Sequence, residues 1–486
     1  MTSRWIQAGL LVLFLCACSG GSEERVAPSG PETIGQQTSV KLIEGSQVTA
    51  EIHPLEDGQW RVDYVFETPQ TVLAFPRSTG DYRRRTWRAE AGTPDIERIE
   101  GADAIVFDKP SLTASFEVTP YARRLPRDYT PFLKFSNGEG AIFLQQFQVD
   151  AFERREDLVE ASSDRDVEGL ALRFGARVIS EKSLLMNGEE HQGQVEYMAG
   201  EGDQEYVYIG NLPLEQGESH IGVIDPELPA HIRESFDDDL ARIFAALEER
   251  WGFALAKKST VYFAFGGTRF EGLSTSGSVA GGDTLVLRAS GKELLEPDET
   301  VRRRILWFFA HEAAHLFEGG RGMAVGSNSQ AWWHEGSADA MAHDLLSHLG
   351  VDSEAYLLKA YRQRIDECGV ELERQPLIGA WGQVPYICGD LVAIIADSAL
   401  VDHNLYDIWN TFIDLAPADL KNADIDDFFL TTLSDMGGST DTVEALRSLI
   451  QDRQENGRIA ILKAFEAAGL EYELDSYGAL TSLQLP

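Results

Sequence analysis

The feature that most constrains this chain is the run His311-Glu312-Ala313-Ala314-His315. Residues four apart lie one turn apart on the same face of a helix, so both imidazoles can reach one ion. The residues before the run, ILWFFA, are apolar and predict that the helix is buried. Glu312 lies beside the first histidine, where it can hold a water molecule and accept its proton. A core helix with hydrogen-bonded histidines is the alternative that the run alone leaves open.

A third ligand decides the class of site. The metzincin pattern needs glycine at position 318 and histidine at position 321, where this chain has Glu318 and Arg321. A second predicted helix, WWHEGSADAMAHDLLSHLG, supplies Glu335 after a glycine-rich connection. His334 is the competing third ligand, but it points about 100° away around the helix. Two histidines and a glutamate with an open fourth position are typical of catalytic zinc, so we predict one Zn²⁺ on the two histidines of the run and Glu335.

Asp339 lies one turn beyond the predicted glutamate ligand, on the same helix face. It can accept the free N–H of a ligating histidine and so fix the orientation of that ring. A solvated carboxylate is the alternative interpretation of Asp339. His343 and His348 follow on the same helix; His343 could support a metal ligand, but an ordinary surface or core histidine is the favoured interpretation.

The motif HEAAH followed by WWHEGSADA resembles the gluzincin metallopeptidases, and within them the glycyl-aminopeptidase-like group (M61) with its W-x-x-E-G element. The resemblance implies a zinc peptidase with a β-rich N-terminal domain, a thermolysin-like catalytic domain and a helical domain. The later run VPYICG, followed by DLVAIIADSAL, resembles a Y-x-K-G segment of the same group. This likeness implies that Tyr386 stabilises the oxyanion, whereas a packed tyrosine is the alternative.

The chain departs from that group in two places. The aminopeptidases carry an acidic motif that binds the free amine of the substrate, on a strand before the zinc helix. The matching stretch here, FGGTRFEGLSTSGSVAGG, contains Gly266, Gly267 and Glu271 but no clean motif. Cys388 stands where the group usually has lysine. The resemblance therefore implies zinc peptidase chemistry and leaves aminopeptidase and endopeptidase activity both open.

The expected reaction is hydrolysis of peptide or protein substrates, with Glu312 as general base and Tyr386 as oxyanion donor. Two other classes compete with it. One is a catalytically inactive lipoprotein that serves as a binding or assembly module on the same fold. The other is a zinc hydrolase of non-peptide amides.

Residues 1–17 predict a bacterial lipoprotein signal peptide. Arg4 precedes an apolar run that is shorter than the ~20 residues needed to span a bilayer. The run LCAC resembles a lipobox, which implies cleavage before Cys18 and acylation of its thiol; an ordinary signal peptide cut elsewhere is the alternative. Residues 18–40 are rich in Gly, Ser, Glu and Pro and predict a flexible tether. Ser19 resembles a Gram-negative outer-membrane sorting signal, which implies an exported protein anchored in that bilayer and facing the periplasm.

Alternating apolar and polar residues predict a β-rich N-terminal domain over residues 41–212. Mixed patterns predict the catalytic domain over residues 213–350, and helical periodicity predicts a helical C-terminal domain over residues 351–486. The fold class is thus multidomain α+β. An exported compartment permits a disulfide between Cys368 and Cys388, although two buried thiols are an equal alternative.

Net charge bears on the partners of the chain. Asp and Glu number 79 against 42 Lys and Arg, which gives a formal net charge of −37. Such a surface repels phosphate backbones, so we expect no nucleic-acid partner.

Overall fold

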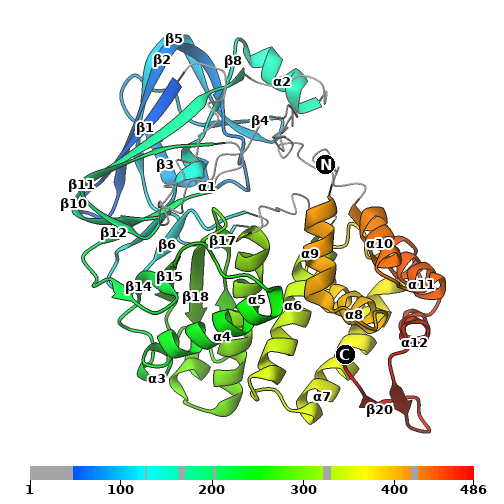
Figure 1. The fold of residues 1–486 in the computed structure, drawn as a ribbon. Coiled ribbons are helices and arrows are strands. Elements are labelled where there is room, and N and C mark those ends of the chain that lie inside the picture. Colours follow the sequence, from blue (N-terminus) through cyan, green and yellow to red (C-terminus); the bar gives the residue numbers. More distant parts are fainter. Residues whose placement is uncertain (1–46, 126–127, 164–169, 201–203, 321–329, 417–424) are drawn as a thin grey trace, which may run out of the picture.

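The computed structural model describes six stretches of the chain: residues 47–125, 128–163, 170–200, 204–320, 330–416 and 425–486. The predicted signal peptide and tether, with Cys18, lie outside these stretches. Figure 1 shows a β-rich N-terminal part and a helical C-terminal part, with a mixed region between them. The predicted class, multidomain α+β, is confirmed.

The N-terminal part is built around one 12-stranded sheet. Alternation explains its strands: in the first strand Val48, Ala50 and Ile52 are fully buried, while the residues between them are partly exposed. The sheet also carries two short helices and one 3-10 turn. The elements are β1 (Gln47–Pro54), β2 (Trp60–Ala74), α1 (Tyr82–Thr86), β3 (Trp87–Ala89), β4 (Glu97–Ile99), β5 (Ala102–Val118), β6 (Phe132–Lys134), β7 (Gly140–Phe143), η1 (Leu144–Phe147), β8 (Asp150–Phe152), α2 (Arg155–Ser163), β9 (Leu170–Ala171), β10 (Arg173–Met186), β11 (Glu189–Met198) and β12 (Tyr206–Gly210).

A six-stranded sheet follows, and its edge borders the candidate site. Its strands are β13 (Glu215–Gln216), β14 (His220–Ile224), β15 (Ser259–Phe265), β16 (Ser274–Ser276), β17 (Val279–Ala280) and β18 (Thr284–Ser290). Strands β14, β15 and β18 are parallel, and β15 is buried along nearly its whole length, as parallel strands covered on both faces are. Strands β16 and β17 pair antiparallel with β18.

Helices cover this sheet and then form the C-terminal part. A single apolar cluster of buried residues runs from α4 through the zinc-motif helix to the last helices. The helical elements are α3 (Ala230–Arg233), α4 (Phe236–Trp251), η2 (Lys292–Leu295), α5 (Glu299–Gly320), α6 (Ala331–His348), α7 (Glu354–Leu372), α8 (Val384–Ser398), α9 (Leu405–Leu415), α10 (Ile425–Asp435), α11 (Thr440–Gln451) and α12 (Gly457–Ala468). Within the described residues, none of the helices combines the length and the apolar character needed to cross a bilayer.

The chain end differs from the helical expectation. Helix α12 ends at Ala468, and the next residue, Gly469, has a φ of +75°, a left-handed value that favours glycine. The following residues form a hairpin of β19 (Tyr472–Leu474) and β20 (Leu480–Leu483). Asp475 stabilises its loop, because its side chain accepts hydrogen bonds from the backbone N–H groups of Tyr477 and Ala479. The chain after α12 therefore forms a hairpin, with Asp475 in its turn, and does not continue as a helix.

Candidate metal centre

Three ligand atoms meet where α5 faces α6. The Nε2 atoms of His311 and His315 lie 3.2 Å apart, and Glu335 Oε2 lies 3.3 Å and 3.2 Å from them. Ligands about 2.0–2.2 Å from a tetrahedral zinc are separated by about 3.3 Å, so these atoms fit one zinc ion. The i,i+4 spacing of the motif explains why the two Nε2 atoms are close together. The chain then returns along α6 and brings Glu335 to them.

Each histidine is oriented by a carboxylate on its other ring nitrogen. Nδ1 of His311 lies 2.8 Å from Asp339 Oδ1, as the sequence predicts. Nδ1 of His315 lies 3.1 Å from Oε2 of Glu318, one turn further along α5. Both carboxylates are buried. A donor N–H at Nδ1 leaves Nε2 free as a metal ligand, so the two contacts select the tautomer that zinc requires.

The same contacts set the charge of the centre. Burial lowers the pKa of His311, but hydrogen bonds to Asp339 and Glu335 outweigh burial and raise that pKa to about 9. Burial raises the pKa of Glu335, but its hydrogen bonds with His311 and His315 outweigh burial and hold that pKa well below its usual range. The ligand carboxylate is therefore ionised at neutral pH, as a metal ligand must be.

Glu312 lies against the edge of the six-stranded sheet. A Cβ atom on Gly277, in the turn between β16 and β17, would fall 2.3 Å from the Glu312 carboxyl carbon. Burial raises the pKa of Glu312, and the neighbouring His311 and His315 oppose the shift. The missing side chain at position 277 thus makes room for the carboxylate beside the ligand histidines.

Tyr386 comes from the first turn of α8. Its hydroxyl is hydrogen-bonded to Glu335, and its ring is stacked on that of His311 with centroids 6.0 Å apart. Burial raises its pKa, and the charge of Glu335 raises it further. The phenol therefore stays protonated and can donate a hydrogen bond at the site.

Close helix packing brings Tyr386 to the centre. A Cβ atom on Gly389 of α8 would fall 1.9 Å from the carbonyl oxygen of Trp332 on α6. A Cβ atom on Gly336 would fall 2.2 Å from the carbonyl carbon of Gly389. Only glycine permits backbones to approach this closely. Gly336 directly follows Glu335, and Gly389 lies one helical turn after Tyr386, so the close backbone contact holds both residues beside the metal centre.

A partly buried arginine supports the centre from α7. Arg364 donates to Asp339 Oδ2 at 3.0 Å, and its Nε lies 2.9 Å from Asp390 Oδ2. Asp390 also accepts a hydrogen bond from Tyr361 at 3.1 Å. Burial raises the pKa of Asp390, and Arg364 opposes that shift. Arg364 therefore compensates two buried carboxylates, one of which orients His311.

The remaining histidines lie around the centre. His334 lies beside His315, with ring centroids 3.9 Å apart, and its Nδ1 lies 2.6 Å from Glu318 Oε2. His343 is buried between Asp352 and Arg364. His348 is exposed at the end of α6. The structure therefore places Glu335, and not His334, with the paired Nε2 atoms.

The stretch that corresponds to the amine-binding motif of the aminopeptidases supplies no carboxylate to the site. Glu271 is exposed and forms an ion pair with Lys292. A Cβ atom on Gly266 would meet the guanidinium of Arg288. Residues 274–280, which run along the edge beside Glu312, contain no acidic residue.

Cys368 and Cys388 form a disulfide that joins α7 to α8.

Sequence reasoning missed three contributors to the site: Glu318, Arg364 and Gly277. Glu318 follows His315 at i+3, a spacing that places two side chains on one helix face and could have identified it. Arg364 and Gly277 carry no such local signal, because other segments bring them to the site.

Comparisons with known proteins address the fold. Neither the family models nor the curated proteins give a match to this sequence. Among solved structures, an aminopeptidase N family protein from Idiomarina loihiensis matches with a TM-score of 0.61 and 15% identity, over 88% of this chain and 79% of that chain. Yeast LTA4 hydrolase in complex with bestatin matches with a TM-score of 0.47 and 11% identity, over 84% and 68% of the two chains. The M1 zinc metallopeptidase from Deinococcus radiodurans matches with a TM-score of 0.45 and 13% identity, over 85% and 94%. The first match shows that this chain shares its fold with the Idiomarina protein, and the other two are too loose to add to it.

Proposed function

We propose that this chain is a zinc-dependent peptidase of the gluzincin type, nearest the glycyl-aminopeptidase-like group. The observation that carries the proposal is the convergence of His311, His315 and Glu335 within 3.3 Å, with a carboxylate behind each histidine. Zinc held there would polarise the scissile carbonyl and lower the pKa of a water molecule at the open position. An inactive binding module is less consistent with this site, because the metal ligands and both candidate catalytic side chains are present.

The chain itself supplies two proton-handling groups. The Glu312 carboxylate accepts the proton of the attacking water and passes it to the leaving nitrogen. Burial raises its pKa, which suits a group that takes up and releases a proton in each cycle. The Tyr386 hydroxyl donates a hydrogen bond to the carbonyl oxygen as negative charge develops on it.

Substitution of the base tests the proposal. We expect Glu312→Gln to retain its zinc and lose nearly all peptide hydrolysis, because the amide cannot accept the proton. Zinc content and turnover of casein-derived peptides are the two measurements. Glu296→Gln, an exposed change just before α5, is the control. A folded wild-type chain that takes up no zinc, or a fully active Glu312→Gln variant, would remove the peptidase assignment.

We further propose that the enzyme does not require a free substrate amine. Two features support this specificity: Glu271 is paired with Lys292 at the surface, and residues 274–280 are not acidic. Matched peptides with free and acetylated N-termini should be cut with similar kcat/KM. A large loss on acetylation would instead assign aminopeptidase activity.

We also propose that the chain is exported and anchored through an acylated Cys18 in the outer membrane of a Gram-negative cell, facing the periplasm. The N-terminal sequence supports this location, and a disulfide between Cys368 and Cys388 is compatible with an oxidising compartment. Labelling with a fatty-acid probe should mark the wild-type chain and not Cys18→Ser. Equal labelling of both would exclude the anchor at this residue.

A further inference from the structure

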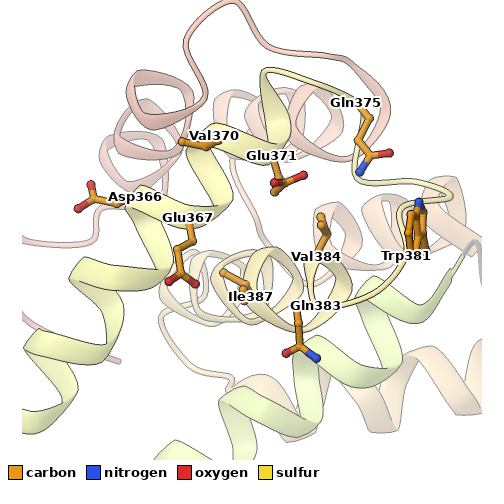
Figure 2. Close-up of a pocket in the computed structure, with 9 residues that line it drawn as sticks. All are labelled: Asp366, Glu367, Val370, Glu371, Gln375, Trp381, Gln383, Val384 and Ile387. Atoms are coloured by element: carbon orange, nitrogen blue, oxygen red, sulfur yellow. The ribbon is translucent and has the colours of Figure 1, made fainter.

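A groove lies between α7 and the start of α8, outside the metal centre (Figure 2). Helix α7 forms one wall, and α8 with the loop before it forms the other. The cavity measures about 690 Å³. Pockets that bind ligands typically measure about 300–1,000 Å³, so this groove has room for several side chains.

The groove exposes apolar surface. Trp381, in the loop before α8, is 68% exposed, and Val370 of α7 is 49% exposed. Val384 and Ile387 of α8 also line this cavity (Figure 2). An exposed tryptophan at the rim of a cavity offers a flat face to a bound side chain.

The groove is also acidic. Of its nine lining side chains three are carboxylates, Asp366, Glu367 and Glu371, and none is basic. Asp366 is paired with Arg458, and Glu371 with Arg374 at 2.5 Å. Among the described residues Glu367 faces no cation and accepts a hydrogen bond from Gln363. Exposed ion pairs contribute about 0–1 kcal/mol, so a bound cation can replace Arg374 at little cost.

A disulfide holds the two walls in place. Cys368 adjoins Glu367 on α7, and Cys388 adjoins Ile387 on α8. Their Cα atoms are 5.2 Å apart, and both side chains are buried behind the groove. The groove is therefore preformed, which lowers the entropy lost when a ligand binds.

We propose that this groove binds a peptide segment in which a lysine or arginine stands next to an apolar side chain. The cation would lie beside the Glu367 and Glu371 carboxylates on α7, and the apolar side chain would contact Ile387 and the face of Trp381 (Figure 2). A second copy of this chain is disfavoured as the occupant, because each copy has a net charge of −37. The proposal rests on this groove alone and does not require the peptidase function.

Fluorescence anisotropy of a labelled, N-acetylated hexapeptide of alternating lysine and leucine tests the proposal. The protein is the mature chain carrying Glu312→Gln, so that cleavage does not compete with binding. We expect Trp381→Ala and the double variant Glu367→Gln/Glu371→Gln each to raise Kd by about tenfold. Matched controls are Tyr477→Ala, an exposed aromatic, and Glu181→Gln/Glu189→Gln on the N-terminal sheet, which should leave Kd unchanged.

Three results would overturn the proposal. The first is an equal Kd for the groove variants and the controls. The second is equal binding of a peptide in which glutamate replaces lysine. The third is competition by free spermidine as effective as that by the unlabelled peptide, which would indicate a site for small cations. Loss of catalysis or of zinc in any variant has no bearing on these outcomes, so this test and that of the peptidase fail separately.

Discussion

At the level of single residues, the metal centre consists of two histidine–carboxylate contacts arranged around one ligand glutamate. Asp339 reaches His311 from α6, whereas Glu318 reaches His315 from the same helix. The two carboxylates also differ in their other neighbours, since Asp339 forms an ion pair with Arg364, whereas Glu318 Oε2 lies 2.6 Å from Nδ1 of His334. The two histidines are thus oriented independently of each other.

The position of Glu312, the proposed general base, depends on the absence of a Cβ atom at Gly277. We expect Gly277→Ala to push the flexible Glu312 carboxylate aside, because the new methyl group would lie 2.3 Å from its carboxyl carbon. A displacement of about 1 Å can lower turnover about 10²-fold, so kcat should fall while zinc content and Tm stay constant. Gly272→Ala is a matched control, since its Cβ would meet no atom within 4 Å. Normal kcat in Gly277→Ala would show that Glu312 does not need this position.

Metal binding should depend on pH through His311, whose pKa is raised to about 9 in the metal-free protein. Zinc needs the neutral imidazole, so it must displace this proton below pH 9. We expect the zinc Kd to fall by about tenfold per pH unit for each proton displaced, between pH 6.5 and 9. Competition with a chelator measures it, and a Kd that is constant over this range would contradict the assignment.

The same raised pKa predicts the stability of the metal-free protein. A histidine whose folded pKa exceeds its unfolded value of about 6.5 stabilises the fold fully below that value. That contribution is lost as the pH rises toward 9. The Tm of the metal-free chain should therefore fall over this interval, and zinc-loaded protein should not follow it.

Residues joined by local helix geometry were predictable, and residues joined by tertiary packing were not. The pairing of His311 with His315 follows from their i,i+4 spacing, and Glu335 follows from the need for a third ligand. Arg364 reaches the site because α7 packs against α8, which in turn packs against α6, and helix periodicity does not predict these tertiary contacts. Glu318 lies three residues after His315, so the same helix geometry places it beside that histidine.

At the level of elements, the contact of α6 with α8 determines where Tyr386 lies. Gly389→Ala gains about 1 kcal/mol of helix propensity but places a methyl group 1.9 Å from the Trp332 carbonyl oxygen. A backbone carbonyl cannot move aside as a flexible side chain can, so α6 and α8 must move apart. Overpacking typically costs about 1–3 kcal/mol, and we expect a lower Tm together with a lower kcat.

Thermal unfolding and turnover of Gly389→Ala test this contact, with Ser398→Ala at the end of the same helix as the control. A variant with unchanged Tm and kcat would mean that α6 and α8 need not approach so closely.

Long periodic elements were predicted better than short ones. The apolar period before HEAAH and the glycines after it correctly indicated α5. Helix α2 and the hairpin of β19 and β20 were not expected, because short elements carry few periodic residues. Asp475 offers a turn signal in the hairpin, yet the strong helices before it favoured a helical interpretation.

At the scale of the whole molecule, the N-terminal part is attached to the six-stranded sheet beside the site. Tyr129 donates a hydrogen bond to the Val279 carbonyl oxygen at 2.7 Å, and Arg288 donates to that of Ala122 at 3.1 Å. A buried cluster of aromatic and aliphatic side chains from both parts lies between them. The sequence predicted both parts but could not predict this contact, because its residues lie up to 166 positions apart.

Asp225 joins the two parts and permits a test of their coupling. Its buried carboxylate accepts hydrogen bonds from the backbone N–H of Ser136 at 2.8 Å and from that of Phe265 at 3.0 Å. Asp225→Ala would leave both donors unsatisfied, at about 1–3 kcal/mol each. We expect calorimetry to show a lower Tm and a separate transition for the N-terminal part, whereas Asp402→Ala at an exposed position should unfold like the wild type. Zinc content should not change, because all three proposed ligands lie on α5 and α6. A loss of zinc with an unchanged Tm would contradict this prediction. It would show that Asp225 supports the metal centre and not the contact between the two parts.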